Sequence, residues 1–365
     1  MLNVINVMSG MKSVVRSASV GLAVAAAMAG SVALANVRLT GAGATFPAPL
    51  YKKWVVEFER IDPAVKIDYN SIGSGGGIKA ITDKTVAFGA SDAPLSKKEI
   101  EGLGGADKLV QIPTTAGAVV PAYNLPGVTG EIKFSGEVLA GIYTGKIAKW
   151  NDPAIAAMNA DIKLPDTAIT PAYRTDGSGT TYVFTSYLAT QSEEFKGSVG
   201  SGKSVKFPVG QGGKGNEGVT AVVQQTPGAI GYIELNYATA NKIAFGAVRN
   251  AGGEYVKASP DSVAAAGAAA ATKLTGTLMA ANIWNQPGAT AYPISAFTYI
   301  ILHKDLSASV ASADEANALK RFLVWATTEG QKTAKDMDYA PLAPEVQSQV
   351  GRALSSLTYK GEALK

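Results

Sequence analysis

Residues 37–54 read Val-Arg-Leu-Thr-Gly-Ala-Gly-Ala-Thr-Phe-Pro-Ala-Pro-Leu-Tyr-Lys-Lys-Trp: a short β-prone run, a glycine-rich turn and the start of a helix. The apolar residues at helical spacing, which predict one buried helix face, are Tyr51, Trp54, Val55 and Phe58. The same order returns at residues 66–70, which precede a second glycine-rich turn and a helix expected to start near Gly77. Strand and helix patterns alternate in this way along the chain, which predicts an α/β fold.

Three loops between a strand and a helix share small residues and a hydroxyl. They read Gly41-Ala-Gly-Ala-Thr-Phe46, Gly73-Ser-Gly-Gly-Gly77 and Arg174-Thr-Asp-Gly-Ser-Gly-Thr180. A helix N-terminus offers free backbone N–H groups and a positive dipole end, so each loop suits an anion, although one such loop alone is an ordinary capped turn. Three loops together with one arginine favour a small free anion. The P-loop pattern of nucleotide-binding proteins, in which a lysine follows a glycine, is absent from these three loops, which argues against a nucleotide ligand there.

A fourth stretch, Gly89-Ala-Ser-Asp-Ala-Pro94, adds a carboxylate. A turn or helix cap is its ordinary interpretation. Within an anion site, however, Asp92 repels the ligand unless the ligand donates a proton. Phosphate carries a proton near neutral pH and sulfate carries none, so Asp92 would favour phosphate over sulfate.

The amino-acid composition excludes several kinds of functional site. The 365 residues suffice for about two domains, and no long linker divides them. Cysteine is absent, which excludes disulfides, thiolate zinc sites and a cysteine nucleophile, and His303 is the one histidine. His303 lies on the apolar run 300–304, where a structural role is favoured over a catalytic one. The net charge of +4 without basic runs argues against a nucleic-acid partner.

Residues 1–35 have the features of a secretory signal peptide. Lys12 and Arg16 precede an apolar run of small residues, and Ala33-Leu-Ala35 is a cleavage motif that predicts Asn36 as the mature start. An uncleaved anchor is the less favoured alternative, because the run is short and rich in alanine. Cleavage leaves 31 basic and 29 acidic residues, a net charge of +2.

The C-terminal region predicts one long strand and two helices. Residues 294–302 form an apolar, β-prone run. Ser312-Ala-Asp-Glu315 is a capping-box pattern, with Gly330 expected as the C-cap of the helix that follows it, and Pro344 opens a last helix.

These loops resemble the periplasmic phosphate-binding proteins of high-affinity phosphate ABC importers. The matching stretches are Gly41-Ala-Gly-Ala-Thr-Phe-Pro-Ala-Pro49, Ile72-Gly-Ser74, Phe88-Gly-Ala-Ser-Asp-Ala-Pro-Leu-Ser96, Arg174 with Asp176-Gly-Ser-Gly-Thr180, Gly212-Gly-Lys-Gly-Asn216 and Pro227-Gly-Ala-Ile-Gly-Tyr232. The resemblance covers essentially the whole mature chain. Position 75 is glycine where close relatives often have serine.

The resemblance implies a two-lobed α/β periplasmic-binding-protein fold of the Venus-flytrap type II class, with two hinge crossover strands. The crossings are expected near residues 123–124 and 294–295. Residues 36–123 plus 295–365 then form a discontinuous lobe I, and residues 124–294 form lobe II. The implied ligand contacts are Thr45, Phe46 through its backbone N–H, Ser74, Asp92, Arg174, Ser178, Gly179 and Thr180. Asp176 is expected to hold Arg174 in place.

The function implied is capture of inorganic phosphate between the lobes and delivery to the membrane subunits of an ABC importer. We expect a cleaved, soluble, monomeric protein of the periplasm, without catalytic residues, metal or cofactor. Two alternatives stay open: a secreted phosphatase-like enzyme on the same fold, and a binder of another oxyanion such as arsenate.

Overall fold

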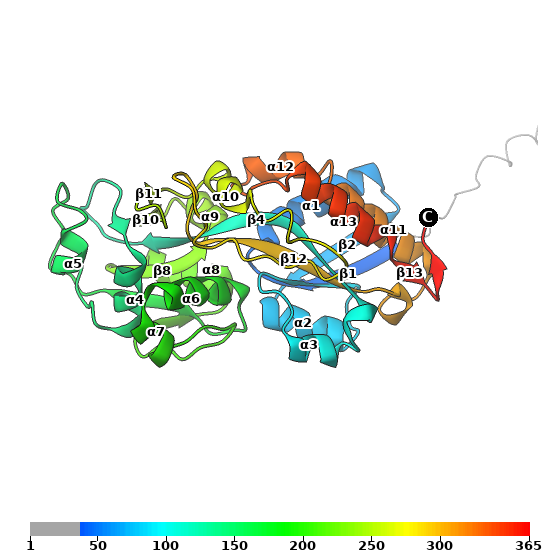
Figure 1. Ribbon diagram of the computed structural model, residues 1–365, viewed down its shortest axis with the longest axis horizontal. Helices are drawn as coiled ribbons and strands as arrows, with labels where there is room; N and C mark the ends of the chain where they lie inside the picture. Colours follow the sequence, from blue (N-terminus) through cyan, green and yellow to red (C-terminus); the bar gives the residue numbers. More distant parts are fainter. Residues whose placement is uncertain (1–36) are drawn as a thin grey trace, which may run out of the picture. The chain divides into compact units, whose positions relative to one another are not determined.

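A computed structural model describes residues 37–365, and a mixed sheet of nine strands runs through them (Figure 1). Eight strands lie in the order β2-β1-β3-β12-β4-β8-β6-β7, and β9 pairs with β4. The predicted signal peptide, residues 1–35, lies outside the described residues. The strands of this sheet are β1 (Val37–Gly43), β2 (Val65–Ser71), β3 (Phe88–Ser91), β4 (Leu109–Tyr123), β6 (Thr170–Arg174), β7 (Gln211–Gly213), β8 (Ala229–Glu234), β9 (Ala244–Phe245) and β12 (Ser295–His303).

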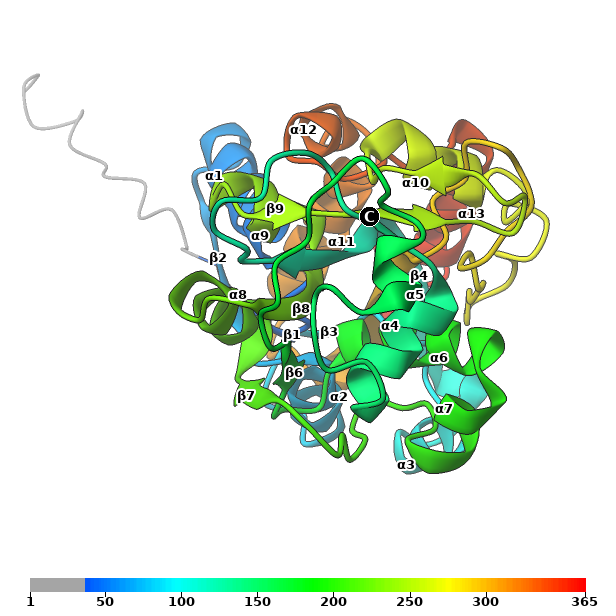
Figure 2. The same ribbon diagram turned by 90° about the vertical axis from the view of Figure 1, so that its left-hand side faces the viewer.

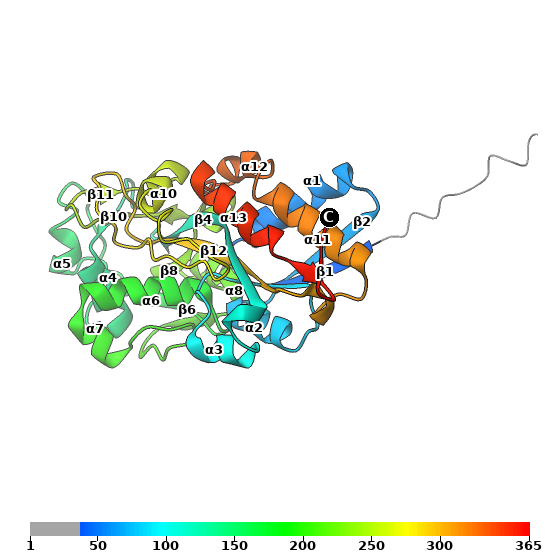
Figure 3. The same ribbon diagram turned by 45° about the vertical axis from the view of Figure 1, so that its right-hand side comes forward.

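Helices cover both faces of the part of the sheet that contains β1, β2 and β3 (Figures 1 and 3). On one face lie α1 (Ala48–Ile61), α11 (Ala313–Ala326), α12 (Gln331–Asp336) and α13 (Pro344–Ser355). On the other face lie α2 (Ser74–Thr82) and α3 (Lys97–Gly102). The short elements here are η1 (Ala106–Lys108), η2 (Leu306–Ala308), β13 (Thr358–Tyr359) and β14 (Glu362–Ala363). Burial of Tyr51, Trp54 and Phe58 gives α1 its inner face, as the spacing predicts.

The part of the sheet that contains β6, β7 and β8 is also covered on both sides (Figures 1 and 2). The helices are α4 (Gly136–Thr144), α5 (Pro153–Ala156), α6 (Gly179–Gln191), α7 (Glu193–Ser198), α8 (Gly215–Gln225), α9 (Leu235–Ala240) and α10 (Pro260–Gly267). A small sheet is formed by β5 (Lys133–Phe134), β10 (Ala247–Arg249) and β11 (Tyr255–Val256). Buried aromatic rings fill the core, where Phe184 stacks on Tyr232 at 4.4 Å between centroids. The predicted α/β class is confirmed.

Two long strands join the two parts. Residues 109–118 of β4 pair antiparallel with β12, and residues 119–123 pair with β8. Every residue of β4 and of β12 is buried. β4 therefore changes partner between Ala118 and Val119 and belongs to both halves of the sheet. The lobe boundaries near residues 123–124 and 294–295 stay a prediction.

Three local predictions need correction. α2 begins at Ser74 and not near Gly77, because Gly73 takes a left-handed φ of +84° and ends the turn there. Ser312 caps α11, but the Glu315 carboxylate accepts the N–H of Ala311 where a capping box would use that of Ser312. Gly330 is not a C-cap, since α11 ends at Ala326 and Gly330 precedes α12 with a φ of −61°. α13 begins at Pro344, as predicted.

Within residues 37–365, no helix combines the length and the apolar character needed to cross a membrane.

Candidate functional site

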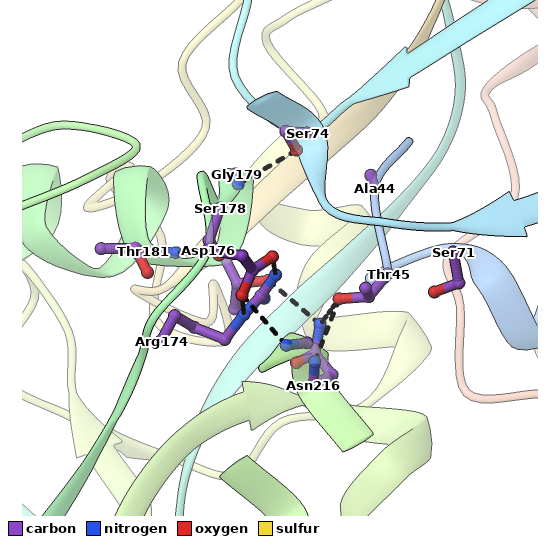
Figure 4. A network of polar contacts seen from close by, with 12 residues as sticks. Ala44, Thr45, Ser71, Ser74, Arg174, Asp176, Ser178, Gly179, Thr181 and Asn216 are labelled. Atoms are coloured by element: carbon purple, nitrogen blue, oxygen red, sulfur yellow. Dashed lines mark hydrogen bonds and ion pairs between the residues drawn. The ribbon is translucent and has the colours of Figure 1, made fainter. Parts of the chain in front are cut away.

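The predicted binding loops lie at the carboxyl ends of parallel strands, although β1 runs on to Gly43, so residues 41–43 belong to the strand and not, as predicted, to the turn. β1 runs parallel to β2 and β3, and β6 runs parallel to β7 and β8, so within each set these ends share one edge of the sheet. Figure 4 shows side chains from both sets meeting. The predicted contact residues, all buried, are Thr45, Phe46, Ser74, Asp92, Arg174, Ser178, Gly179 and Thr180.

Arg174, at the end of β6, is held by a bidentate ion pair. Its Nε lies 2.7 Å from Asp176 Oδ1, and its Nη2 lies 2.5 Å from Asp176 Oδ2. Burial alone would raise the pKa of Asp176, but the hydrogen bonds and charge of Arg174 hold it below its usual value. The remaining guanidinium nitrogen, Nη1, donates to Thr180 Oγ1 at 3.3 Å. The edge of the guanidinium group formed by Nε and Nη2 is thus held in place by Asp176.

Ser74 and Gly179 join the two halves of the sheet. The N–H of Gly179, at the start of α6, donates to Ser74 Oγ at 3.0 Å (Figure 4), and the N–H of Asp92 donates to the same oxygen at 3.2 Å. A Cβ at position 179 would lie 2.5 Å from Asp92 Oδ2 and 2.6 Å from Ser74 Oγ. Only glycine therefore allows α6 to approach this closely. Ser178 Oγ, one residue earlier, accepts the Thr181 N–H and caps α6.

Asp92 is a buried carboxyl group surrounded by hydroxyls. Thr298 Oγ1 donates to its Oδ1 at 2.8 Å, and Ser74 Oγ lies 3.4 Å from its Oδ2. Burial raises the pKa of Asp92 to about 7, although the Thr298 bond and the charge of Arg174 oppose this shift. A carboxyl group with such a pKa can take up or release a proton near neutral pH.

Phe46, which is predicted to bind through its backbone N–H, has its side chain in the hydrophobic core. The ring packs into the core, 6.3 Å from the ring of Tyr339 between centroids, and the Phe46 carbonyl accepts the Tyr339 hydroxyl. Among the described residues, none accepts a hydrogen bond from the Phe46 N–H. This group is therefore available to a ligand.

Sequence reasoning gave no role to Asn216 and Thr298. Asn216 lies in a stretch that resembles the family, so a signal existed but did not identify its partners. Asn216 contacts Thr45, 171 residues away in sequence. Thr298 lies within an apolar strand, where nothing marked it as a partner of Asp92.

His303 lies at the end of β12, buried, with Nε2 3.1 Å from the carbonyl of Ile81. Burial lowers its pKa. Among residues 37–365, no group of three or more histidine, cysteine, aspartate or glutamate side chains is placed to hold a metal ion.

Comparisons with known proteins identify the class and then the family. Residues 29–329 match the model of the PBP superfamily domain. The chain is 45% identical over 309 residues to "Phosphate-binding protein PstS" of Pasteurella multocida, covering 84% of this chain and 87% of the relative. The protein of the same name from Haemophilus influenzae is 42% identical over 314 residues, covering 86% and 91%.

The fold is also found among solved structures. One described as a high affinity periplasmic phosphate-binding protein bound with phosphate aligns with a TM-score of 0.68 at 20% identity, covering 88% of this chain and 99% of that chain. The chain belongs to the PBP superfamily and, within it, to the family of the PstS phosphate-binding proteins. The predicted family and two-lobed fold are thereby confirmed.

Proposed function

We propose that this protein captures inorganic phosphate between its two lobes and delivers it to the membrane subunits of an ABC importer. It acts as an exported, monomeric protein of the periplasm, after cleavage between Ala35 and Asn36. One observation carries the proposal: the buried guanidinium of Arg174, paired with Asp176, lies among buried hydroxyl and backbone donors, and its charge acts on the buried carboxyl group of Asp92.

This donor set matches a tetrahedral oxyanion. Arg174 and the positive end of the α6 dipole supply charge, and the Phe46 N–H and the hydroxyls of Thr45 and Thr180 supply donors. We assign the phosphate contacts to Thr45, Phe46, Ser74, Asp92, Arg174, Ser178, Gly179 and Thr180, with Asp176 holding Arg174. The first four come from lobe I, residues 36–123 plus 295–365, and the others from lobe II, residues 124–294. Phosphate therefore favours the closed arrangement by contacting both lobes.

Asp92 selects for a protonated anion. Its buried carboxylate accepts a hydrogen bond from a phosphate hydroxyl, whereas sulfate has no proton to offer. Arsenate resembles phosphate in its protonation, so this device does not separate the two.

The enzyme alternative is not favoured. The relatives are named as binding proteins, and His303, the one imidazole in the chain, contacts the carbonyl of Ile81 in the core. Ser178 Oγ accepts the N–H of Thr181, as a helix cap does. We assign no catalytic residue.

Isothermal titration of the mature protein with phosphate, arsenate and sulfate tests the proposal. We expect one phosphate per chain, similar binding of arsenate, and no heat from sulfate. An absence of phosphate binding would overturn the proposed function. A parallel assay on a generic phosphomonoester, with metal supplied, tests the enzyme alternative, because sustained turnover contradicts a role restricted to binding.

A further inference from the structure

Asn216 lies between residues of the two proposed lobes, at the start of α8 (Figure 4). It is fully buried. Its side-chain nitrogen Nδ2 lies 2.7 Å from Thr45 Oγ1 and 3.2 Å from Thr180 Oγ1. One amide group therefore contacts two hydroxyls that reach the site from opposite sides.

The orientation of this amide is fixed by the main chain. The backbone N–H of Glu234 donates to Asn216 Oδ1 at 2.9 Å. A backbone N–H can only donate, so the atom it contacts must be the amide oxygen. The amide nitrogen consequently faces the two threonines, and each of its two hydrogens has a hydroxyl to bind.

The Thr45 hydroxyl has both of its acceptor positions filled. Its Oγ1 accepts from the Asn216 backbone N–H at 3.1 Å and from Asn216 Nδ2 at 2.7 Å. Gly215 makes the first bond possible, because its left-handed φ of +71° turns the backbone at the start of α8. A hydroxyl accepts two hydrogen bonds and donates one. The Thr45 hydroxyl is therefore left as a donor.

The Thr180 hydroxyl has the same polarity. Its Oγ1 accepts from Arg174 Nη1 at 3.3 Å and from Asn216 Nδ2 at 3.2 Å. With both lone pairs occupied, its proton is directed to a third partner. Arg174 fixes one of these bonds and Asn216 fixes the other.

We propose that Asn216 is a positioning residue that turns the hydroxyls of Thr45 and Thr180 into fixed donors for the bound anion. This role rests on the proposed binding of phosphate. Phosphate oxygens only accept from such donors, so hydroxyls whose protons already point to the ligand need no reorientation when it binds.

A double-mutant cycle tests this role. In the wild-type background we expect Asn216→Leu, which removes the amide at similar size, to weaken phosphate binding about tenfold. In the Thr45→Val, Thr180→Val background, which lacks both hydroxyls, we expect the same substitution to change the Kd by less than about twofold. Equal losses in the two backgrounds would show that Asn216 acts through packing alone and overturn the proposal.

A second variant keeps the shape of the side chain. Asn216→Asp retains the acceptor for the Glu234 N–H but replaces the donor nitrogen with an oxygen, to which both hydroxyls would donate. We expect a loss of roughly 100-fold in the wild-type background, and a clearly smaller loss without the hydroxyls, where only the added charge acts. An equal loss in both backgrounds also contradicts the proposal.

Two controls complete the design. Asn241→Leu, at an exposed asparagine after α9, should leave the Kd unchanged. Thermal unfolding of each ligand-free variant reports whether it folds. If the wild-type protein binds no phosphate, both the proposed function and the positioning role of Asn216 are refuted. If the wild type binds and the cycle is additive, only the role of Asn216 falls.

Discussion

The Asp92 carboxyl group belongs to the proposed phosphate site, and its protonation state decides whether it repels the anion or binds it. With a pKa of about 7, the group exchanges its proton in the same pH range in which phosphate does. A single shared proton between Asp92 and phosphate removes the repulsion. Sulfate brings no proton of its own to share.

Asp92→Asn should relax the discrimination against sulfate, because the amide supplies an N–H donor where the carboxylate supplied only acceptors. Competition calorimetry, with sulfate titrated against bound phosphate, measures the effect. Asp83→Asn, a change at a residue in a solvent-exposed ion pair with Lys79, serves as the control. A variant that still ignores sulfate would refute the role given to Asp92.

Arg174→Ala should weaken phosphate binding by about 2 kcal/mol or more, since it removes a buried charge-assisted donor. It also leaves the Asp176 carboxylate without its partner, which adds repulsion. Arg249→Ala, which breaks a largely exposed ion pair with Glu137, should change the affinity little. Unchanged calorimetric affinity of Arg174→Ala would remove Arg174 from the site.

At the scale of single residues, the sequence predicts contacts between groups of the same loop. The family resemblance predicts that Asp176 holds Arg174, and the two residues lie two positions apart in one loop. Asn216 and Thr298 act on Thr45 and Asp92 at separations of 171 and 206 residues. Such partners become neighbours only through the order of strands in the sheet, so no local pattern reveals them.

Among the helices and strands, some boundaries are set by the local sequence and others by tertiary contacts. β1, α1 and α13 follow from alternation, spacing and proline position, and the structure confirms them. The end of α11 does not, because Gly330 is required by close packing and not as a C-cap: a Cβ there would lie 2.9 Å from Ala326 Cα. Gly77, within α2, is small for a related reason, since a Cβ there would lie 2.5 Å from Gly43 Cα.

The junction of β8 and α9 contains a buried acid. Glu234 is fully buried, and among the described residues its Oε1 has no hydrogen-bond partner. Burial raises its pKa well above the usual value, and the charges of Asp338 and Asp92 add to this, although the Asn236 N–H opposes the shift. The folded protein therefore binds a proton at Glu234 more tightly than the unfolded chain does, whose pKa at this position is about 4.3.

This proton makes stability dependent on pH. Because the folded pKa is raised, the contribution of Glu234 is complete below the unfolded pKa and is lost as the pH rises towards the folded pKa. Glu234→Gln should remove that loss, so its Tm should exceed that of the wild type by more at pH 8 than at pH 5. Calorimetric melting at both pH values measures this, with the exposed Glu254→Gln as control. An equal difference at both pH values would contradict the prediction.

At the scale of the whole folded chain, Gly75 and Gly177 bring α2 and the loop before α6 together. The Gly75 N–H donates to the Gly177 carbonyl at 2.9 Å, and a Cβ on Gly177 would lie 3.1 Å from Gly75 Cα. Gly75 and Gly177 therefore form one of the close contacts between the two proposed lobes.

Gly177→Val should hinder closure and weaken phosphate binding about tenfold, because a smaller fraction of the protein reaches the closed state. Small-angle scattering should show less compaction on phosphate addition than in the wild type, with the Tm of the ligand-free protein little changed. Gly197→Val, where a Cβ meets no atom within 4 Å, is the matched control. Compaction equal to that of the wild type would refute this account of closure.

The shared strands also determine the order in which the chain can fold. β12 lies between β3 and β4, so the edges of both strands stay unpaired until residues 295–303 are available. Among residues 37–365, strands β6, β7 and β8 pair only with one another and with β4, all of which precede β12 in the chain. Unpaired edges invite association with other chains. A nascent or truncated polypeptide that stops before β12 is therefore the form of this protein most exposed to aggregation.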